Sequence, residues 1–118
     1  YNTWPLMGDY YFPDDNKFIN LFKFSAFSDP SLVQYLHRNL AYLIFIIYIL
    51  ISYKTFRYKF FNLFKPLIIL GLIILLQIVL GILTVLSGAS ILTASLHQFS
   101  SILLITSCLY FLYRNRFS

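Results

Sequence analysis

Two histidines are the residues of this sequence best suited to chemistry, because they are its only ones and each lies inside an apolar segment. His37 follows Pro30 by about two helical turns, and His97 follows Ile91 by a similar distance. An imidazole placed in lipid needs a partner. Neutral imidazole is a common metal ligand, and two on facing helices can bind one heme iron from opposite sides. The spacing predicts a six-coordinate heme site suited to electron transfer, with His37 and His97 as the metal ligands.

Three polar residues beside the histidines are candidate contacts for such a cofactor. Arg38 can pair with a heme propionate, because a guanidinium binds carboxylates through two hydrogen bonds. It can equally extend its charged head to the membrane interface. Gln34 can touch a cofactor edge, and Gln98 can orient a ligand or bond to a neighbouring helix. The alternative for both histidines is an interfacial or packing role without a cofactor.

The composition predicts a membrane protein. Of 118 residues, 59% are hydrophobic and only 11% are charged, against about 25% charged in soluble domains. We expect an all-α polytopic transmembrane bundle, in which each span crosses a hydrocarbon core of about 30 Å. Residues 1–29 are predicted to be an outer-side loop with an amphipathic segment on the membrane surface. Residues 30–118 would hold the transmembrane helices, with spans at about 30–53, 67–86 and 91–113.

The charge distribution predicts the topology. All four acidic residues lie in the first thirty positions, whereas basic residues gather in the segment 54–65 and at the end of the chain. Cytoplasmic loops are enriched in Lys and Arg, so we place 54–65 inside and 1–29 and 87–90 outside. Both histidines then lie near the outer face. This pattern argues against nucleic acid as a partner, despite the net charge of +5.

Other classes of site find no support in the sequence. The single cysteine, Cys108, excludes an internal disulfide and a cysteine-based metal cluster. The acids fall in one loop, and we predict no catalytic residue. Polar and small residues share one face of the second apolar run, and we interpret them as a helix-packing seam: Gln77, Gly81, Thr84 and Gly88.

Four stretches together point to a family. They are Tyr-Asn-Thr-Trp-Pro-Leu-Met-Gly at 1–8, Leu-Val-Gln-Tyr-Leu-His-Arg at 32–38, Leu-Gln-Ile-Val-Leu-Gly-Ile-Leu-Thr at 76–84, and His-Gln at 97–98. In this order and spacing they resemble the second half of heme A synthase, in the form shared by mitochondria and alphaproteobacteria. That membrane enzyme converts heme O to heme A for cytochrome oxidase, and the resemblance covers nearly the whole chain.

The resemblance implies a division of labour between two four-helix halves. The second half holds heme b, and His37 and His97 match its axial ligands. The first half is where the heme O methyl group is oxidised to the formyl group of heme A. Gln34 stands where that first half has a glutamate, which fits a cofactor half. The chain would therefore be the C-terminal half without its opening helix, supporting this oxidation.

The resemblance also implies partners and a location. We expect the missing N-terminal half, heme O as substrate of the full oxidoreductase, and the lipid bilayer as partners. A second copy and cytochrome oxidase assembly factors are further expected partners, in a bacterial or mitochondrial inner membrane. We expect no turnover from this part alone. The alternatives are a non-enzymatic heme b electron-transfer subunit, and an inactive remnant or scaffold without cofactor.

Overall fold

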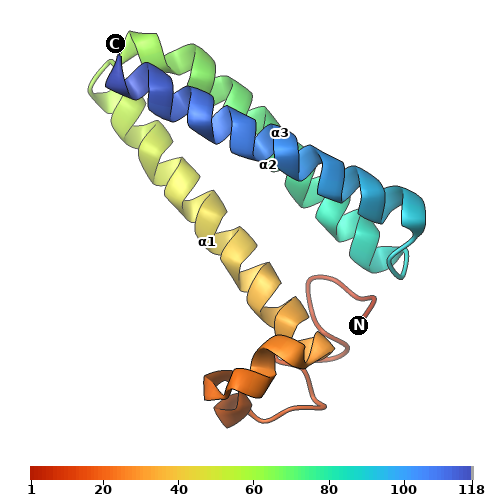
Figure 1. Cartoon of the computed structure of the whole chain (residues 1–118). Coiled ribbons are helices and arrows are strands. Elements are labelled where there is room, and N and C mark those ends of the chain that lie inside the picture. The colour runs from red at the N-terminus through yellow and green to blue at the C-terminus, as the bar shows by residue number, and fades with distance from the viewer. Residues whose placement is uncertain (118) are drawn as a thin grey trace.

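The computed structural model describes residues 1–117, which contain helices and no strands. Three of the helices are long and apolar enough to cross a membrane. The predicted all-α bundle with three spans is thereby confirmed. The long helices, labelled in Figure 1, are α1 (Pro30–Arg57), α2 (Phe64–Leu86) and α3 (Ile91–Arg116). Three short 3-10 helices complete the described part: η1 (Phe18–Phe22), η2 (Phe24–Ser28) and η3 (Phe61–Leu63).

The first long helix begins where a capping residue and a proline meet. The Asp29 carboxylate accepts hydrogen bonds from the backbone amides of Ser31 at 3.0 Å and Leu32 at 3.1 Å. Pro30 takes the first helical position, where no amide hydrogen is needed. The helix continues to Arg57 rather than ending near residue 53, since basic side chains in its last turn complement the helix dipole.

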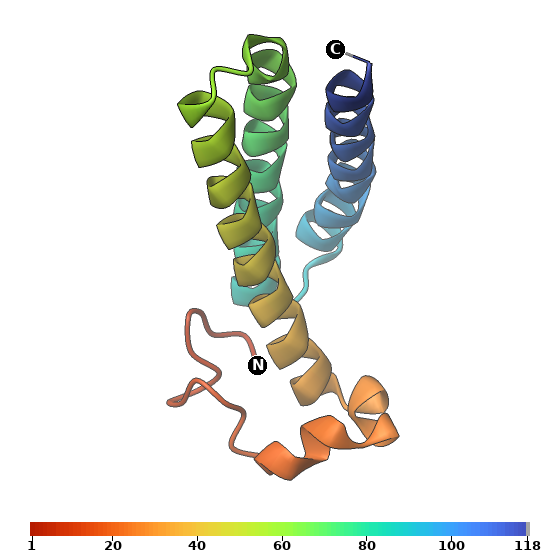
Figure 2. The same cartoon turned by 90° about the vertical axis from the view of Figure 1, so that its left-hand side faces the viewer.

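A tight reversal joins the second and third helices. Gly88 and Ala89 have φ values of +65° and +60°, a conformation that costs glycine little. The Ala89 amide donates to the Thr84 carbonyl at 2.8 Å, which satisfies one of the last carbonyls of α2. Ser90 then caps α3 by accepting from the Thr93 amide at 3.3 Å. α2 and α3 consequently run antiparallel and side by side (Figures 1 and 2).

The first helix stands apart from this pair. α1 meets α2 near η3, where the Tyr48 hydroxyl donates to the Leu67 carbonyl at 3.0 Å. Gly71 lies against the Tyr48 ring, and a Cβ at that position would collide with the phenol oxygen. Buried apolar residues of α2 lie toward the same end: Leu67, Leu70 and Ile74. Toward its N-terminus α1 diverges from α2 and α3 (Figure 1).

The N-terminal loop packs on the beginning of α1. Met7, Ala26 and Leu32 form a small buried apolar group there. Outside it, η1 and η2 carry exposed aromatic rings, with Phe24 93% exposed. These exposed rings suit the predicted position on a membrane surface, which stays a prediction.

Candidate cofactor site

The two histidines face each other across the space where α1 diverges from α3. Their ring centroids are 6.1 Å apart, and the ring planes cross at 85°. His37 is exposed on α1, whereas His97 is half-buried on α3. The structure thus brings together the two residues that the sequence singled out as a pair.

This separation fits two imidazoles that share one iron. An iron–nitrogen bond of about 2.0 Å on each side, plus about 1.1 Å from nitrogen to ring centre, puts two such centroids about 6 Å apart. Among residues 1–117, no group of three His, Cys, Asp or Glu could hold a metal ion. Two imidazoles would hold an iron only if that iron brought its other donors with it, as heme iron does. The residues fit heme rather than a free ion.

One buried atom of His97 lacks a partner. Its Nδ1 is buried and makes no hydrogen bond within the described part of the chain. A buried polar atom without a partner costs free energy. The described residues therefore leave one nitrogen of His97 without a hydrogen-bond partner. This is consistent with a site for a further group.

The second helix supports His97 from behind. The Gln77 Nε2 donates to the His97 carbonyl at 3.1 Å, and the Ser100 hydroxyl donates to the same carbonyl at 3.0 Å. Ser100 also hydrogen-bonds to the Gln77 Oε1. A Cβ added at Gly81 would lie 3.2 Å from the Cε1 of His97. Part of the predicted packing seam of α2 therefore lies against the candidate ligand.

Arg38 fastens the N-terminal loop to α1. Its side chain is only 9% exposed. The Nη2 donates to the Thr3 carbonyl at 2.6 Å, and the Nη1 donates to the carbonyls of Leu6 at 3.0 Å and Pro5 at 3.3 Å. The Nε is buried and has no partner among the described residues. The propionate contact stays a prediction, and Nε is the donor free to make it.

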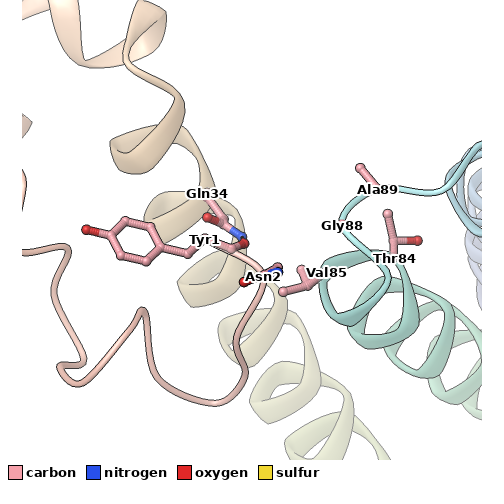
Figure 3. Close-up of a pocket in the computed structure, with 7 residues that line it drawn as sticks. All are labelled: Tyr1, Asn2, Gln34, Thr84, Val85, Gly88 and Ala89. Atoms are coloured by element: carbon pink, nitrogen blue, oxygen red, sulfur yellow. The ribbon is translucent and has the colours of Figure 1, made fainter.

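A cavity of about 550 Å³ lies between the start of the chain, α1 and the α2–α3 turn. Gln34 lines it and donates through Nε2 to the Tyr1 carbonyl at 2.7 Å. Gln34 precedes His37 by about one helical turn, and Thr84 follows Gly81 by about one turn. The lining side chains are uncharged (Figure 3): Tyr1, Asn2, Gln34, Thr84, Val85 and Ala89, with Gly88.

Gln98 is not brought together with the other candidates. Its side chain is exposed on α3 and makes no hydrogen bond to another described residue. Its contact with a ligand stays a prediction. Ser100 lies about one helical turn after His97, and its hydroxyl is brought against the His97 carbonyl.

Hydrogen bonds to acidic side chains hold the loop on the start of α1. The Ser31 hydroxyl donates to the Asp15 carboxylate at 2.6 Å and lowers the pKa of that carboxyl. The Tyr1 hydroxyl donates to Asp14, and this bond raises the pKa of the phenol. Together with Arg38, these contacts determine where the loop lies over the cavity.

Comparisons with known proteins agree on one family. The family model described as "Cytochrome oxidase assembly protein" matches residues 1–109. A heme A synthase of Pelagibacter ubique is 40% identical over 115 residues, covering 98% of this chain and 34% of that relative. The heme A synthase of Rickettsia prowazekii is 34% identical, covering 98% of this chain and 35% of that relative. The heme A synthase of Wolbachia pipientis is 36% identical, covering 95% of this chain and 30% of that relative. No solved structure matches. The chain spans about a third of the length of these relatives.

Proposed function

The chain belongs to the family of cytochrome oxidase assembly proteins, and from that premise we propose that it is the cofactor-holding part of a heme A synthase. The relatives are heme A synthases, which supports the activity. This chain spans about a third of their length, so we assign the activity to the larger protein. Within it, this part would support the oxidation of the heme O methyl group to the formyl group of heme A. The remaining part would hold the substrate.

The observation that carries the proposal is the 6.1 Å separation of the His37 and His97 rings. In the proposed site these two imidazoles would hold heme b. Heme b held by two imidazoles would supply one-electron transfer. The separation of the two rings supports the proposal, because it matches the distance that such ligation would need.

Three further residues would orient the macrocycle. The buried Arg38 Nε would donate a hydrogen bond to a propionate, since it has no partner among the described residues. Gln34 would contact an edge from the cavity wall, where its amide also fastens the first residue of the loop. Gln98 would orient the ligand from the exposed surface of α3. All three lie within about one turn of a candidate ligand.

We place the chain in an inner membrane as a multi-pass protein, with the heme site near the outer face. The three membrane-length helices and the bacterial relatives support a location in the membrane. The acidic loop before α1 and the basic segment after it support the orientation. A reporter fused after Lys59 should give an inside signal, and an outside signal would contradict this orientation.

A chimera tests the proposed function. The matching third of the Pelagibacter ubique heme A synthase is replaced by this chain, and the hemes extracted from membranes are separated by chromatography. We expect heme A from the chimera, and only heme O when it carries His97→Ala. The control is Ser107→Ala, further along the same helix, whose hydroxyl bonds only to the Leu103 carbonyl within α3 and which should retain heme A.

The outcomes separate the possible functions. A chimera that is inserted, binds heme b and yet makes no heme A would support the electron-transfer subunit instead. A chimera that is inserted, binds no heme b and makes no heme A would refute the cofactor role and favour the scaffold.

A further inference from the structure

The amide of Gln77 makes two contacts that converge on one turn of α3. Its Nε2 donates to the His97 carbonyl at 3.1 Å, and its Oε1 accepts from the buried hydroxyl of Ser100. The Ser100 hydroxyl also reaches the His97 carbonyl, at 3.0 Å. Both polar ends of the Gln77 amide are therefore satisfied by the turn that carries His97. In an apolar environment such bonds between helices are costly to lose.

Gly81 lies one turn further along the same face of α2. A Cβ there would come within 3.2 Å of the His97 Cε1 and 3.7 Å of both ring nitrogens. The imidazole therefore rests against bare backbone, and a methyl group at this position would require the ring to move by a few tenths of an ångström. The backbone of His97 is held by Gln77 and its ring is supported at Gly81.

We propose that Gln77, Ser100 and Gly81 form a seat that fixes the position and ring orientation of His97. Gln77 and Ser100 are then positioning residues for the iron ligand, a role that rests on the proposed function. No comparable contact from a neighbouring helix to His37 exists among the described hydrogen bonds. Groups that orient a metal ligand commonly matter nearly as much as the ligand itself.

Substitutions in the seat should alter the spectrum of the heme iron while the heme stays bound. In Gln77→Leu the His97 carbonyl loses one donor and the Ser100 hydroxyl loses one acceptor, so the α3 turn can shift. In Gly81→Ala the new methyl group must push the ring by a few tenths of an ångström. The electronic state of low-spin heme iron depends on how its axial imidazoles are turned, so both changes should alter its spectrum.

The test compares two serines of α3 in the full chain loaded with heme b in membranes. Ser100→Ala removes a hydroxyl that contacts Gln77, whereas Ser107→Ala removes one that bonds only to the Leu103 carbonyl of its own helix. Both serines are buried. We expect Gln77→Leu, Gly81→Ala and Ser100→Ala to retain heme but shift the low-spin electron paramagnetic resonance signal. Ser107→Ala should leave that signal unchanged.

A second readout does not depend on heme. The chain has two histidines, so labelling histidine with ¹³C at the carbonyl and ¹⁵N in the ring gives two sets of magnetic resonance signals. Gln77→Leu and Ser100→Ala should move the His97 carbonyl signal and leave that of His37 in place. If Ser107→Ala moves it equally, or if neither seat variant moves it, the seat is refuted. If the wild-type chain does not bind heme b, the proposed function is refuted. The carbonyl signals of the heme-free chain would still test the seat.

Discussion

The α2–α3 pair and the α1 helix hold their histidines in opposite ways. On α3, His97 is half-buried and supported by side-chain hydrogen bonds and close backbone contact from α2. On α1, His37 is exposed, and the helix meets α2 chiefly at its far end through Tyr48. Near His37, α1 is instead bound to the N-terminal loop by Arg38 and Gln34.

His97 is thus a candidate ligand fixed by helix packing, whereas His37 is a candidate ligand whose helix is held by a loop. An antiparallel pair with a short turn and interhelical hydrogen bonds has little freedom to move. A helix joined to that pair at one end can change its angle at low cost. We therefore expect His97 to determine whether heme stays bound, and His37 to determine whether its iron is six-coordinate.

The largest expected effect follows from removing each ligand in turn. Loss of a residue that orients a metal ligand lowers metal affinity by roughly 10–100-fold. His97→Ala removes the ligand itself and should lower heme affinity by more than that. His37→Ala should retain part of the heme on His97, as a five-coordinate high-spin species. Heme content and absorption spectra of purified membranes measure both. Equal, complete loss in both variants would remove the proposed difference between the two regions.

Arg38→Ala tests the loop as the second support. The change removes the bonds to the Thr3, Pro5 and Leu6 carbonyls. We expect heme affinity to fall about 10–100-fold while the low-spin spectrum persists, because the ligands remain. Proteolysis of the loop should also become faster.

The matched control for that prediction lies at the other end of the molecule. Arg114 also donates to a backbone carbonyl, that of Asn62, at 3.4 Å. Arg114→Ala should leave heme affinity unchanged. If both arginine variants weaken heme binding equally, the effect of Arg38 is one of general stability.

A smaller effect is expected where α1 meets α2. Gly71→Ala introduces a methyl group that collides with the Tyr48 ring, and overpacking of this kind costs about 1–3 kcal/mol. The midpoint of thermal unfolding in detergent should fall. Leu72→Ala, an exposed position next along α2, is the control. An unchanged midpoint for Gly71→Ala would mean that α1 is not held at this point.

The smallest effect is a dependence of loop attachment on pH. The Ser31 hydroxyl lowers the pKa of the Asp15 carboxyl below its ordinary value of 3.8. A carboxyl with a lowered folded-state pKa stabilises the folded loop above pH 3.8 and loses this contribution as pH falls through the lowered pKa. Hydrogen exchange in residues 1–29 should speed up only below that value. The dependence should disappear in Asp15→Asn.

Local patterns in the sequence predicted much of this fold. The length and apolarity of three segments predicted the helices. The capped start of the first helix is likewise a local feature, because Asp29 and Pro30 are adjacent in the sequence. The matching depth of two histidines predicted a pair, because a helical rise per residue converts position into depth. The resemblance to heme A synthase agrees with the family that the comparisons identify.

Features that depend on distant contacts were beyond the sequence. The partners of Arg38 are backbone carbonyls, which no residue type reveals. The divergence of α1 from α2 follows from where Tyr48 and Gly71 meet, a tertiary contact. Gln77 was recognised as part of a seam, but its contact with the turn of His97 depends on the register between two helices.

Titration of heme b into the purified chain tests the central claim most directly, that His37 and His97 hold one heme between them. The account predicts that Soret absorbance saturates at one heme per chain and that the ferric product is low-spin. It also predicts that the double variant His37→Ala, His97→Ala takes up none. Saturation by the double variant, or a high-spin product in the wild-type chain, would contradict the account.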